Sequence, residues 1–193
     1  AVKDNLYIYG AEVEFCGTEK QEVYFENPKD SYLVRPVFTN SNVEFPNGLH
    51  GWTMMGDEEI IGNRFIGNMD LNGHALTVKG NLIQESGEMY LHGDCKLKVE
   101  GDYRIQKETE GEGEEKTYTE STGWIYMISG EMEIDGDFVT ESTVALSSSA
   151  NAFGGGTIKI KGNLKQLEAT NENNAAVKDN LYIYGAEVEF CGT

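Results

Sequence analysis

The sequence predicts an all-β chain that folds as a parallel β-helix, also called a β-solenoid, and three observations support this prediction. Residues 1–18 reappear without change as residues 176–193. A shorter and more degenerate motif occurs six times along the chain. Apolar and polar residues often alternate, whereas no stretch has the period of an amphipathic helix. Together these patterns favour stacked strands over an α/β architecture.

The long repeat sets the expected domain organisation. Eighteen identical positions that lie 175 residues apart do not arise by chance. We therefore expect residues 1–175 to form one repeat unit and residues 176–193 to begin the next identical unit. The chain then corresponds to a window of a tandem array, and any secretion or wall-anchoring signal lies outside it. Covalent joining of the units and assembly from separate subunits both stay open, although identical flanking sequence favours the covalent array.

The shorter motif consists of an apolar residue, a spacer, Gly or Asp, Asn or Asp, and a large apolar residue. Its copies begin at Val2, Val78, Val99, Ile134, Ile160 and Val177, and are 76, 21, 35, 26 and 17 residues apart. The compact spacings indicate roughly 17–26 residues per solenoid coil, 35 fits one coil with an insertion, and 76 fits three or four less obvious coils. With about eight or nine coils at about 4.8 Å each, the expected axial repeat is about 40 Å.

Stacking of the coils in register explains why the motif recurs. Equivalent residues would lie above one another, because a single coil cannot bury its own apolar face. The expected core column is Leu76, Leu97, Met132 and Ile158, and a second apolar column is Leu82, Tyr103, Phe138, Leu164 and Leu181. The residues after the Gly or Asp should form a ladder at a bend, where Gly tolerates unusual φ and Asx side chains bond turn backbone. This ladder comprises Asn5, Asn81, Asp102, Asp137, Asn163 and Asn180.

Alternating segments outside the motif predict further strands. They cover residues 6–9, 11–15, 21–25, 34–38, 69–71, 89–91, 125–127 and 157–160. Two insertions interrupt the coils: residues 107–120 have the composition of a solvated loop or extended hairpin, and residues 141–156 form an irregular excursion that could contain a coil of its own. The number of coils in residues 19–68 and 143–155 stays open.

Charge limits the classes of partner. The chain carries a formal charge of −18, and the copied segment carries −2, so one 175-residue unit carries −16. Nucleic acid is an improbable partner, because phosphate binding depends on Lys and Arg and the chain has 15 of these against 33 acidic residues. Such charge favours solubility and repulsion between neighbouring chains. No run of 18 or more apolar residues predicts membrane insertion.

The cysteines and the outward tyrosines are candidates for lateral contacts. Each unit owns only Cys16 and Cys95, because Cys191 is the next copy of Cys16. In a stack of coils the two lie too far apart for a disulfide, so free thiols are expected. Alternation places Cys16, Tyr7 and Tyr9 on the outside, where they could contact another filament or a sugar. Ordinary β-propensity also explains outward tyrosines and is the favoured interpretation.

Several segments resemble a known family. They are KQEVYFENP (20–28) with SYL (31–33), MDLNGHALTVKGNL (69–82), GDYRIQ (101–106), and GDFVTES (136–142) followed by GTIKIKGNLKQ (156–166). The chain is similar to repetitive β-solenoid modules of very large surface proteins of Gram-positive bacteria (Bacillota). The resemblance covers most of the chain and implies a parallel β-solenoid at the cell surface. The family offers no active-site residues, and residues 143–155 depart from its pattern.

A catalytic role is one alternative, because parallel β-helices include polysaccharide lyases and hydrolases, which use carboxylate pairs or bound Ca²⁺. The candidate carboxylates are Asp57, Glu58, Glu59, Asp102 and Asp137. A structural role is favoured, since Asx residues after Gly form turns and acidic runs are commonly solvated. His50, His74 and His92 lack metal-binding spacing, the acidic residues 108–120 lack a Ca²⁺-binding spacing, and residues 147–149 lack a nucleophile-elbow context. No catalytic, metal or cofactor-binding residue is predicted.

Three function classes remain. The preferred one is a non-enzymatic structural unit of an extracellular filament or surface fibre, whose partner is itself through head-to-tail strand stacking. The alternative is a cell-surface adhesin module that binds glycans or matrix through its side face, and the third is a carbohydrate-active enzyme. The ends favour the first class, because isolated solenoids need polar caps whereas Ala1 and Thr193 both lie in stackable sequence.

Overall fold

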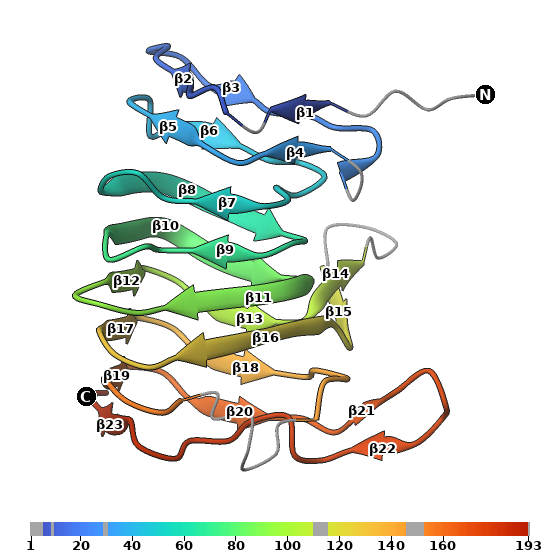
Figure 1. The fold of residues 1–193 in the computed structure, drawn as a ribbon. Helices are drawn as coiled ribbons and strands as arrows, with labels where there is room; N and C mark the ends of the chain where they lie inside the picture. Colours follow the sequence, from blue (N-terminus) through green and yellow to red (C-terminus); the bar gives the residue numbers. More distant parts are fainter. Residues whose placement is uncertain (1–5, 9, 29–30, 110–115, 146–152, 193) are drawn as a thin grey trace.

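The structure is a computed structural model that describes residues 6–8, 10–28, 31–109, 116–145 and 153–192. Within these ranges the chain is all-β and contains no helix. The strands are short and lie one above another from the N-terminal end to the C-terminal end of the molecule (Figure 1). Apart from two hairpins, the paired strands are parallel, as predicted from the alternating pattern.

The strands form three faces, and we call the stretch of chain that contributes to each face in turn a rung. The first face holds β2 (Val13–Phe15), β5 (Pro36–Phe38), the first half of β8 (Glu58–Phe65), the first half of β10 (Ala75–Gln84), β12 (Lys96–Val99), β17 (Glu131–Ile134), β19 (Thr157–Ile160) and β23 (Glu187–Phe190). The second face holds β3 (Gln21–Glu22), β6 (Val43–Glu44), the second halves of β8 and β10, β13 (Tyr103–Ile105), β18 (Phe138–Thr140) and β20 (Leu164–Gln166).

The third face holds β1 (Tyr7–Ile8), β4 (Tyr32–Leu33), β7 (Trp52–Thr53), β9 (Met69–Asp70), β11 (Ser86–Leu91) and β16 (Thr122–Met127). Single parallel bridges continue it from Met127 to Phe153 and from Phe153 to Ile183. The first and second faces join at a corner inside β10, where the register against β8 shifts between Lys79 and Leu82. A long strand that bends at this corner therefore serves both faces.

Two antiparallel hairpins extend from the stack. The hairpin of β14 (Lys107–Thr109) and β15 (Thr117–Thr119) occupies the insertion at residues 107–120, as one of the two expected alternatives. The hairpin of β21 (Ala169–Thr170) and β22 (Ala176–Val177) was not expected. It pairs residues just before the second copy of the repeat with the first residues of that copy.

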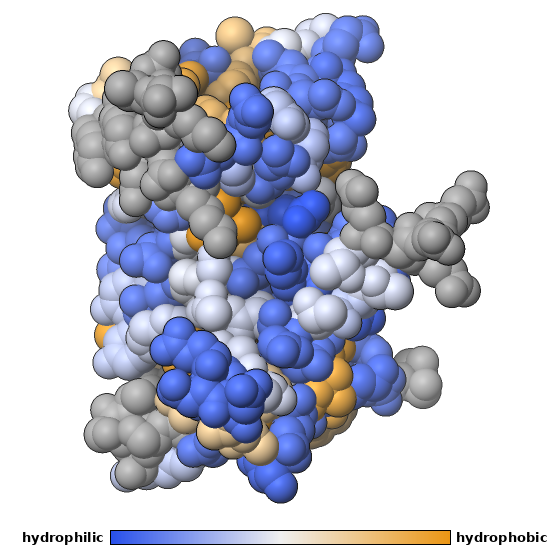
Figure 2. All heavy atoms as spheres, turned by 90° about the vertical axis from the view of Figure 1, so that its right-hand side faces the viewer, coloured by the Kyte–Doolittle hydropathy of each residue, from blue (hydrophilic) through white to orange (hydrophobic). Residues whose placement is uncertain are grey.

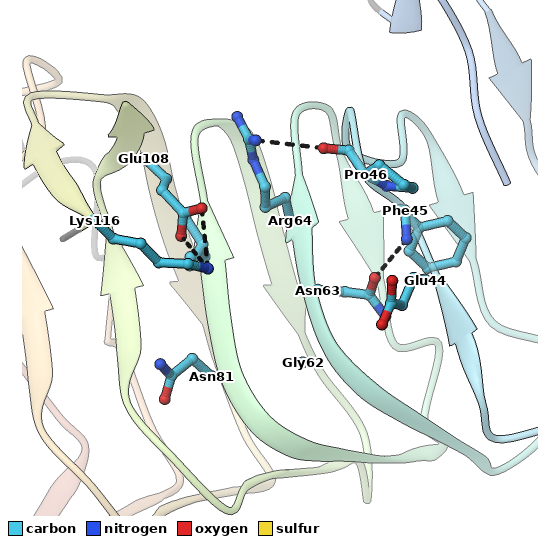
Figure 3. Close-up of a pocket in the computed structure, with 10 residues that line it drawn as sticks. Glu44, Phe45, Pro46, Gly62, Asn63, Arg64, Asn81, Glu108 and Lys116 are labelled. Carbon is cyan, nitrogen blue, oxygen red and sulfur yellow. Dashed lines mark hydrogen bonds and ion pairs between the residues drawn. The ribbon is translucent and has the colours of Figure 1, made fainter. Parts of the chain in front are cut away.

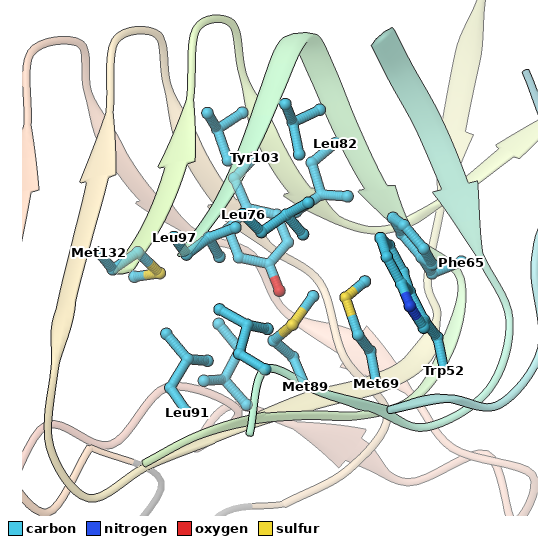
Figure 4. Packing of buried hydrophobic residues seen from close by; sticks show 14 of the residues in the cluster. Trp52, Phe65, Met69, Leu76, Leu82, Met89, Leu91, Leu97, Tyr103 and Met132 are labelled. Atoms are coloured by element: carbon cyan, nitrogen blue, oxygen red, sulfur yellow. The ribbon is translucent and has the colours of Figure 1, made fainter. Parts of the chain in front are cut away.

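The core fills the space between the three faces. The alternation of each strand points one set of side chains inward, and the inward set is apolar (Figure 4). Leu76 is paired with Leu97, Leu97 with Met132, and Met132 with Ile158, so these four residues form one buried column. The Tyr103 hydroxyl donates to buried Gln84 Oε1 at 2.7 Å, which satisfies a polar tip within this core.

Candidate assembly interface

An Asx ladder links successive rungs at the corner between the first and second faces. The Asp102 N–H donates to Asn81 Oδ1 at 2.8 Å, and the Asp137 N–H donates to Asp102 Oδ1 at 2.9 Å. The Asn163 N–H and Nδ2 both donate to Asp137 Oδ1 at 2.8 Å. Each side chain thus accepts the backbone amide of the next rung, and the strand hydrogen bonding continues around the corner.

The glycine before each later ladder residue makes room for the side chain of the preceding rung. A Cβ on Gly101 would overlap Asn81 Oδ1, and a Cβ on Gly136 would overlap Asp102 Oδ1. The same substitution at Gly162 would overlap the backbone of Gly136. Only Gly80 among the four ladder glycines has a positive φ, of 101°. The expectation that unusual φ explains the glycines is therefore wrong at three positions, where close approach is the reason.

Asn180 lies outside this ladder, contrary to the prediction. Its side chain is only 2% exposed, and its Nδ2 donates to Leu167 O at 2.9 Å. Leu181 is likewise not paired with Leu164, although it packs against the core. The reason is visible in the sequence, because Asp179 stands where the ladder requires a glycine. Asn5, the equivalent of Asn180, lies outside the described residues.

The next rung after β19–β20 uses a later part of the copied segment. Ile158 is paired with Val188 and Ile160 with Phe190. Gly192 then occupies the position of Gly162, since a Cβ there would meet Lys161 O. This step from Ile160 to Phe190 is 30 residues long, because the hairpin at 169–177 is inserted. The 17-residue spacing to Val177 is therefore not a coil.

The copied segment is a strand at both ends of the stack, and each copy is paired along a different edge. In the first copy, Val13 is paired with Pro36 and Phe15 with Phe38, so the bonded edge faces the following rung. In the second copy, Val188 is paired with Ile158 on the preceding rung. The third face repeats this relation, since Ile8 is paired with Leu33 whereas its equivalent Ile183 bridges Phe153.

The two copies also use different backbone groups. In the first copy the Val13 N–H donates to Arg35 O at 3.1 Å, and Phe15 O accepts from the Asn40 N–H at 2.9 Å. In the second copy the donors are the N–H groups of Glu187 and Cys191, which correspond to positions 12 and 16. Alternate residues of a parallel strand direct their polar groups to opposite sides. One copy of the segment can therefore hold both sets of bonds at once.

The side chains at this strand differ between the copies in a related way. The Phe15 ring stacks on Phe38 with centroids 5.4 Å apart and an interplanar angle of 13°. Its equivalent Phe190 is 64% exposed, because no following rung covers it. A following rung with the sequence of residues 36–38 would bury this ring, which would stabilise the stack by about 1–2 kcal/mol.

Charges alternate along the outer side of the first face. Glu131 binds both Lys96 (2.9 Å) and Lys159 (3.2 Å), which lie on the rungs before and after it. Hydrogen bonds from these two lysines lower the pKa of Glu131, and the bond from Lys96 has the larger effect. Lys161 binds Asp135 at 2.5 Å. In the same register Glu189 is paired with Lys159, so the second copy continues the alternation. Figure 2, which shows the right-hand side of Figure 1, is also largely hydrophilic, with a few apolar residues among the polar ones.

Two polar side chains join the second and third rungs, a role that the sequence pattern did not predict for either of them. The Phe38 N–H donates to Glu58 Oε2 at 3.0 Å, and the Phe45 N–H donates to Asn63 Oδ1 at 2.7 Å. Burial raises the pKa of Glu58, and the bond from the Phe38 amide opposes this shift. Both side chains point inward from β8 and take the place of strand-to-strand backbone bonds. An inward polar residue within an alternating pattern was the available sequence signal.

The predicted lateral-contact residues lie at or near the surface where they are described. Cys16 and its copy Cys191 are exposed free thiols, whereas Cys95 is buried. The side chains of Tyr7 and Tyr9 lie outside the described residues. Their copies are Tyr182, which is half-buried, and Tyr184, which is 69% exposed. The copy therefore presents one tyrosine to solvent on the third face.

The candidate carboxylates are each used within the fold. Asp102 and Asp137 serve the ladder and bind Arg104 (2.6 Å) and Lys165 (2.5 Å) respectively. Of the acidic run at 57–59, Asp57 accepts the Ala75 N–H at 2.8 Å, Glu58 accepts the Phe38 N–H, and Glu59 binds Lys79 at 2.5 Å. These five side chains are not gathered in one cavity.

A polar hollow of about 290 Å³ lies on the second face beside the β14–β15 hairpin (Figure 3). Its walls carry Glu44, Arg64, Asn81, Glu108 and Lys116. Lys116 binds Glu108 at 3.1 Å, and Arg64 binds Glu85 and donates to Pro46 O at 3.3 Å. Lys116 and Glu108 are thus paired within the hollow, whereas Arg64 and Glu44 pair with Glu85 and Lys20, which lie outside its lining.

The histidines do not gather into a metal centre. His92 Nε2 lies 2.9 Å from Asp70 Oδ1, and His74 Nδ1 lies 3.7 Å from Asp57 Oδ1. Within the described part of the chain, no group of three or more His, Cys, Asp or Glu side chains could hold a metal ion.

Comparison with protein-family models, with curated protein sequences and with solved structures gave no match. Over the ranges that the structure covers, no helix is long and apolar enough to cross a bilayer.

Proposed function

We propose that this chain is one period of a parallel β-solenoid that continues through a tandem array, and that the array serves as a structural filament or surface fibre. The observation that carries this proposal is the copied strand, which is paired along opposite edges at the two ends through different backbone groups. A segment placed between residues 157–160 and the next copy of residues 36–38 would satisfy both edges. Such a contact is heterologous and non-closing, so it propagates.

The geometry supports a shorter period than the sequence predicted. From β2 to its copy β23 the first face passes through β5, β8, β10, β12, β17 and β19, so one 175-residue period contains seven rungs. At about 4.8 Å per rung the axial rise of one unit is about 34 Å. The sequence-based expectation of eight or nine coils and about 40 Å is higher, in part because the 17-residue step from Ile160 to Val177 holds a hairpin and is not a rung.

The hairpin supports a covalent junction between units. Ala169 and Val177 are paired and both are buried, although Ala169 precedes the copied segment and Val177 belongs to it. Buried Asn180 fixes the same connection through its bond to Leu167 O. The last residues of one unit thus fold together with the first residues of the next. We place residues 1–175 and 176–193 in successive units on this basis.

The location at a bacterial surface rests on the family resemblance of residues 20–28, 31–33, 69–82, 101–106, 136–142 and 156–166. The charge of −16 per unit suits such a fibre, because neighbouring fibres repel and stay dispersed. No described group of residues supports the enzyme alternative, since the candidate carboxylates accept hydrogen bonds from backbone N–H groups or form ion pairs with Lys or Arg.

Arrays of one, two and three units, each extended by residues 176–193, test the proposal. Small-angle X-ray scattering should show a maximum dimension that grows by about 34 Å per unit, while the cross-sectional radius stays constant. Separate beads on flexible junctions would instead give a variable end-to-end distance and a cross-section that does not describe a rod. That result would refute the continuous solenoid. A three-unit array with Gly136→Ala in every unit serves as a control that weakens stacking without changing chain length.

A further inference from the structure

An aromatic patch lies on the outer side of the third face and has no role in the stack. It consists of Tyr90 and His92 on β11 and of Trp124 and Tyr126 on β16. The inward positions of these strands are held by buried residues such as Met89 and Leu91, Ile125 and Met127. The patch residues therefore occupy the outward positions of the two strands and are half-buried, and Trp124 also packs against the core cluster.

The four rings form a connected and rigid platform. Tyr90 stacks on His92 at 4.4 Å and lies 5.4 Å from the Tyr126 ring, which in turn lies 6.2 Å from the Trp124 ring. His92 Nε2 lies 2.9 Å from Asp70 Oδ1, which holds the end of the series. Rings that are held by neighbours lose little freedom when they bind a ligand, so the platform is preorganised.

The charge beside the platform has one sign. Glu88 is the direct neighbour of Trp124 across the β11–β16 pair, and Asp70 is the direct neighbour of Tyr90. The strands β9, β11 and β16 contain no Lys or Arg. Among the described residues, the Glu88 carboxylate makes no hydrogen bond or ion pair. Partial burial, and then Asp70, raise the pKa of Glu88, which agrees with a carboxylate that lacks a cationic partner.

We infer that this patch binds a linear polysaccharide that carries free amino groups, of the glucosamine type. The aromatic faces would stack on sugar rings and attract an ammonium group, and Glu88 would accept a hydrogen bond from that ammonium group. Neutral or acidic chains would leave Glu88 unpaired. A second copy of this protein fits less well, because the chain carries a charge of −18 and like charges would meet.

The same face extends the site along the stack. Ile183 bridges Phe153, which bridges Met127, so Tyr182 and Tyr184 lie two rungs beyond Tyr126. Their rings are 6.3 Å apart and nearly parallel at 13°. In a tandem array both aromatic groups would recur in every period, and a long glycan could contact several of them. Multivalent contact of this kind raises avidity without any new type of contact. The inference itself requires only the single chain.

Tryptophan fluorescence reports directly on this site. The chain has two tryptophans, and Trp52 is 1% exposed in the core, so a ligand at the surface perturbs Trp124. The 193-residue chain is titrated with a β-1,4-linked glucosamine hexamer, its N-acetylated counterpart and polygalacturonate, and affinities are measured by calorimetry. We expect the glucosamine hexamer to bind and to change the Trp124 emission, the N-acetylated hexamer to bind at least about fivefold more weakly, and polygalacturonate not to bind.

Matched variants separate the site from general attraction to an acidic protein. Glu88→Gln should weaken glucosamine binding about tenfold, whereas Glu168→Gln, an equal change of charge at another exposed position, should leave it unchanged. Tyr126→Ser should weaken binding about fivefold, and Tyr24→Ser, at a tyrosine that is 60% exposed elsewhere, should not. Circular dichroism confirms that each variant is folded.

Three results would overturn the inference. The first is the absence of glucosamine binding, and the second is equal weakening by Glu88→Gln and Glu168→Gln, which would indicate unspecific attraction. The third is concentration-dependent association of the chain, seen by sedimentation, that Tyr126→Ser abolishes, because the patch would then be a contact between filaments. Failure of the filament proposal would leave these measurements unaffected, since they use one chain and one face.

Discussion

Replacement of Gly136 by alanine tests whether the Asx ladder stabilises the stack by close approach. A Cβ at this position would lie 2.8 Å from the backbone carbon and oxygen of Gly101 and would overlap Asp102 Oδ1. Overpacking against backbone costs about 1–3 kcal/mol. Displacement of Asp102 also deprives the Asp137 N–H of its acceptor, which costs about 1–3 kcal/mol. Alanine also lowers the conformational entropy of the unfolded chain, which stabilises the folded state by about 0.4–1 kcal/mol. We expect a net loss of about 3 kcal/mol.

The measurement is urea unfolding of the 193-residue chain, followed by circular dichroism, together with hydrogen exchange of the Asp137 and Asn163 amides. Gly56→Ala is the matched control, because a Cβ on Gly56 would meet no atom within 4 Å and its φ is not positive. The control should be neutral or slightly stabilising. Equal stability of the two variants would show that the rungs do not approach as closely as described, and the ladder argument would fail.

Three further substitutions test other parts of the stack. Phe190→Ser should lower the free energy of unfolding by less than about 1 kcal/mol in the 193-residue chain, because the ring is 64% exposed there. In a two-unit array, where the next rung would cover the ring, the loss should be about 2–3 kcal/mol. Equal losses in the two proteins, measured by urea unfolding, would contradict continuous stacking. Asp137, whose pKa the hydrogen bonds from Lys165 and then Asn163 lower from 3.8 to about 2, should contribute stability above pH about 4 that is lost as the pH falls toward about 2. Unfolding of Asp137→Asn should accordingly depend less on pH in that window, and parallel pH profiles would refute the assignment. Glu58→Ala should lower the free energy of unfolding by about 1–3 kcal/mol, because the Phe38 N–H loses its acceptor. Glu58→Gln keeps an acceptor and removes a carboxylate whose pKa is raised by burial, so this variant should be at least as stable as the native chain at pH 7. Equal losses of stability in the two variants would argue against the hydrogen bond.

Much of the fold could be predicted because each rung of the stack contacts only the rungs before and after it. Leu76, Leu97, Met132 and Ile158 occupy the same place in a local motif, and parallel stacking turns that equivalence into direct pairing. Neither step requires knowledge of distant contacts. The ladder from Asn81 to Asn163 was predictable for the same reason, since each Gly–Asx step recurs at the same corner.

The predicted rungs were wrong or incomplete in two places: where a segment has the motif but does not form a rung, and where a rung lacks the motif. The segment from Val177 to Leu181 matches the motif, with Asp179 at the position that holds Gly or Asp, yet it forms part of a hairpin and its connection. A side chain at position 179 would collide with the preceding rung, as the Gly162 geometry shows. In residues 19–68 the pattern is broken differently, because inward Glu58 and Asn63 replace backbone pairing between rungs. A search for apolar columns does not detect rungs that polar side chains connect.

The aromatic patch was not predicted because its members are far apart in the sequence. Tyr90 and Tyr126 are separated by the β14–β15 hairpin and come together only through the β11–β16 pair. The alternation of each strand marks them as outward, but only the register shows that they are neighbours. Outward positions were predicted for Tyr7 and Tyr9, since both lie in one short segment, and their copies are Tyr182 and Tyr184.

The pairing of the copied ends bears on the proposal that the units are joined covalently. If two 193-residue chains stacked end to end in register, Val188 would meet Val13, and Glu189 would meet Glu14 directly. Like charges directly opposite in a sheet are destabilising. Within the stack the neighbour of Glu189 is Lys159, and the neighbour of Glu14 is Val37. The segment is therefore suited to form one rung between these two neighbours and unsuited to stack on itself, which favours units joined in a single polypeptide.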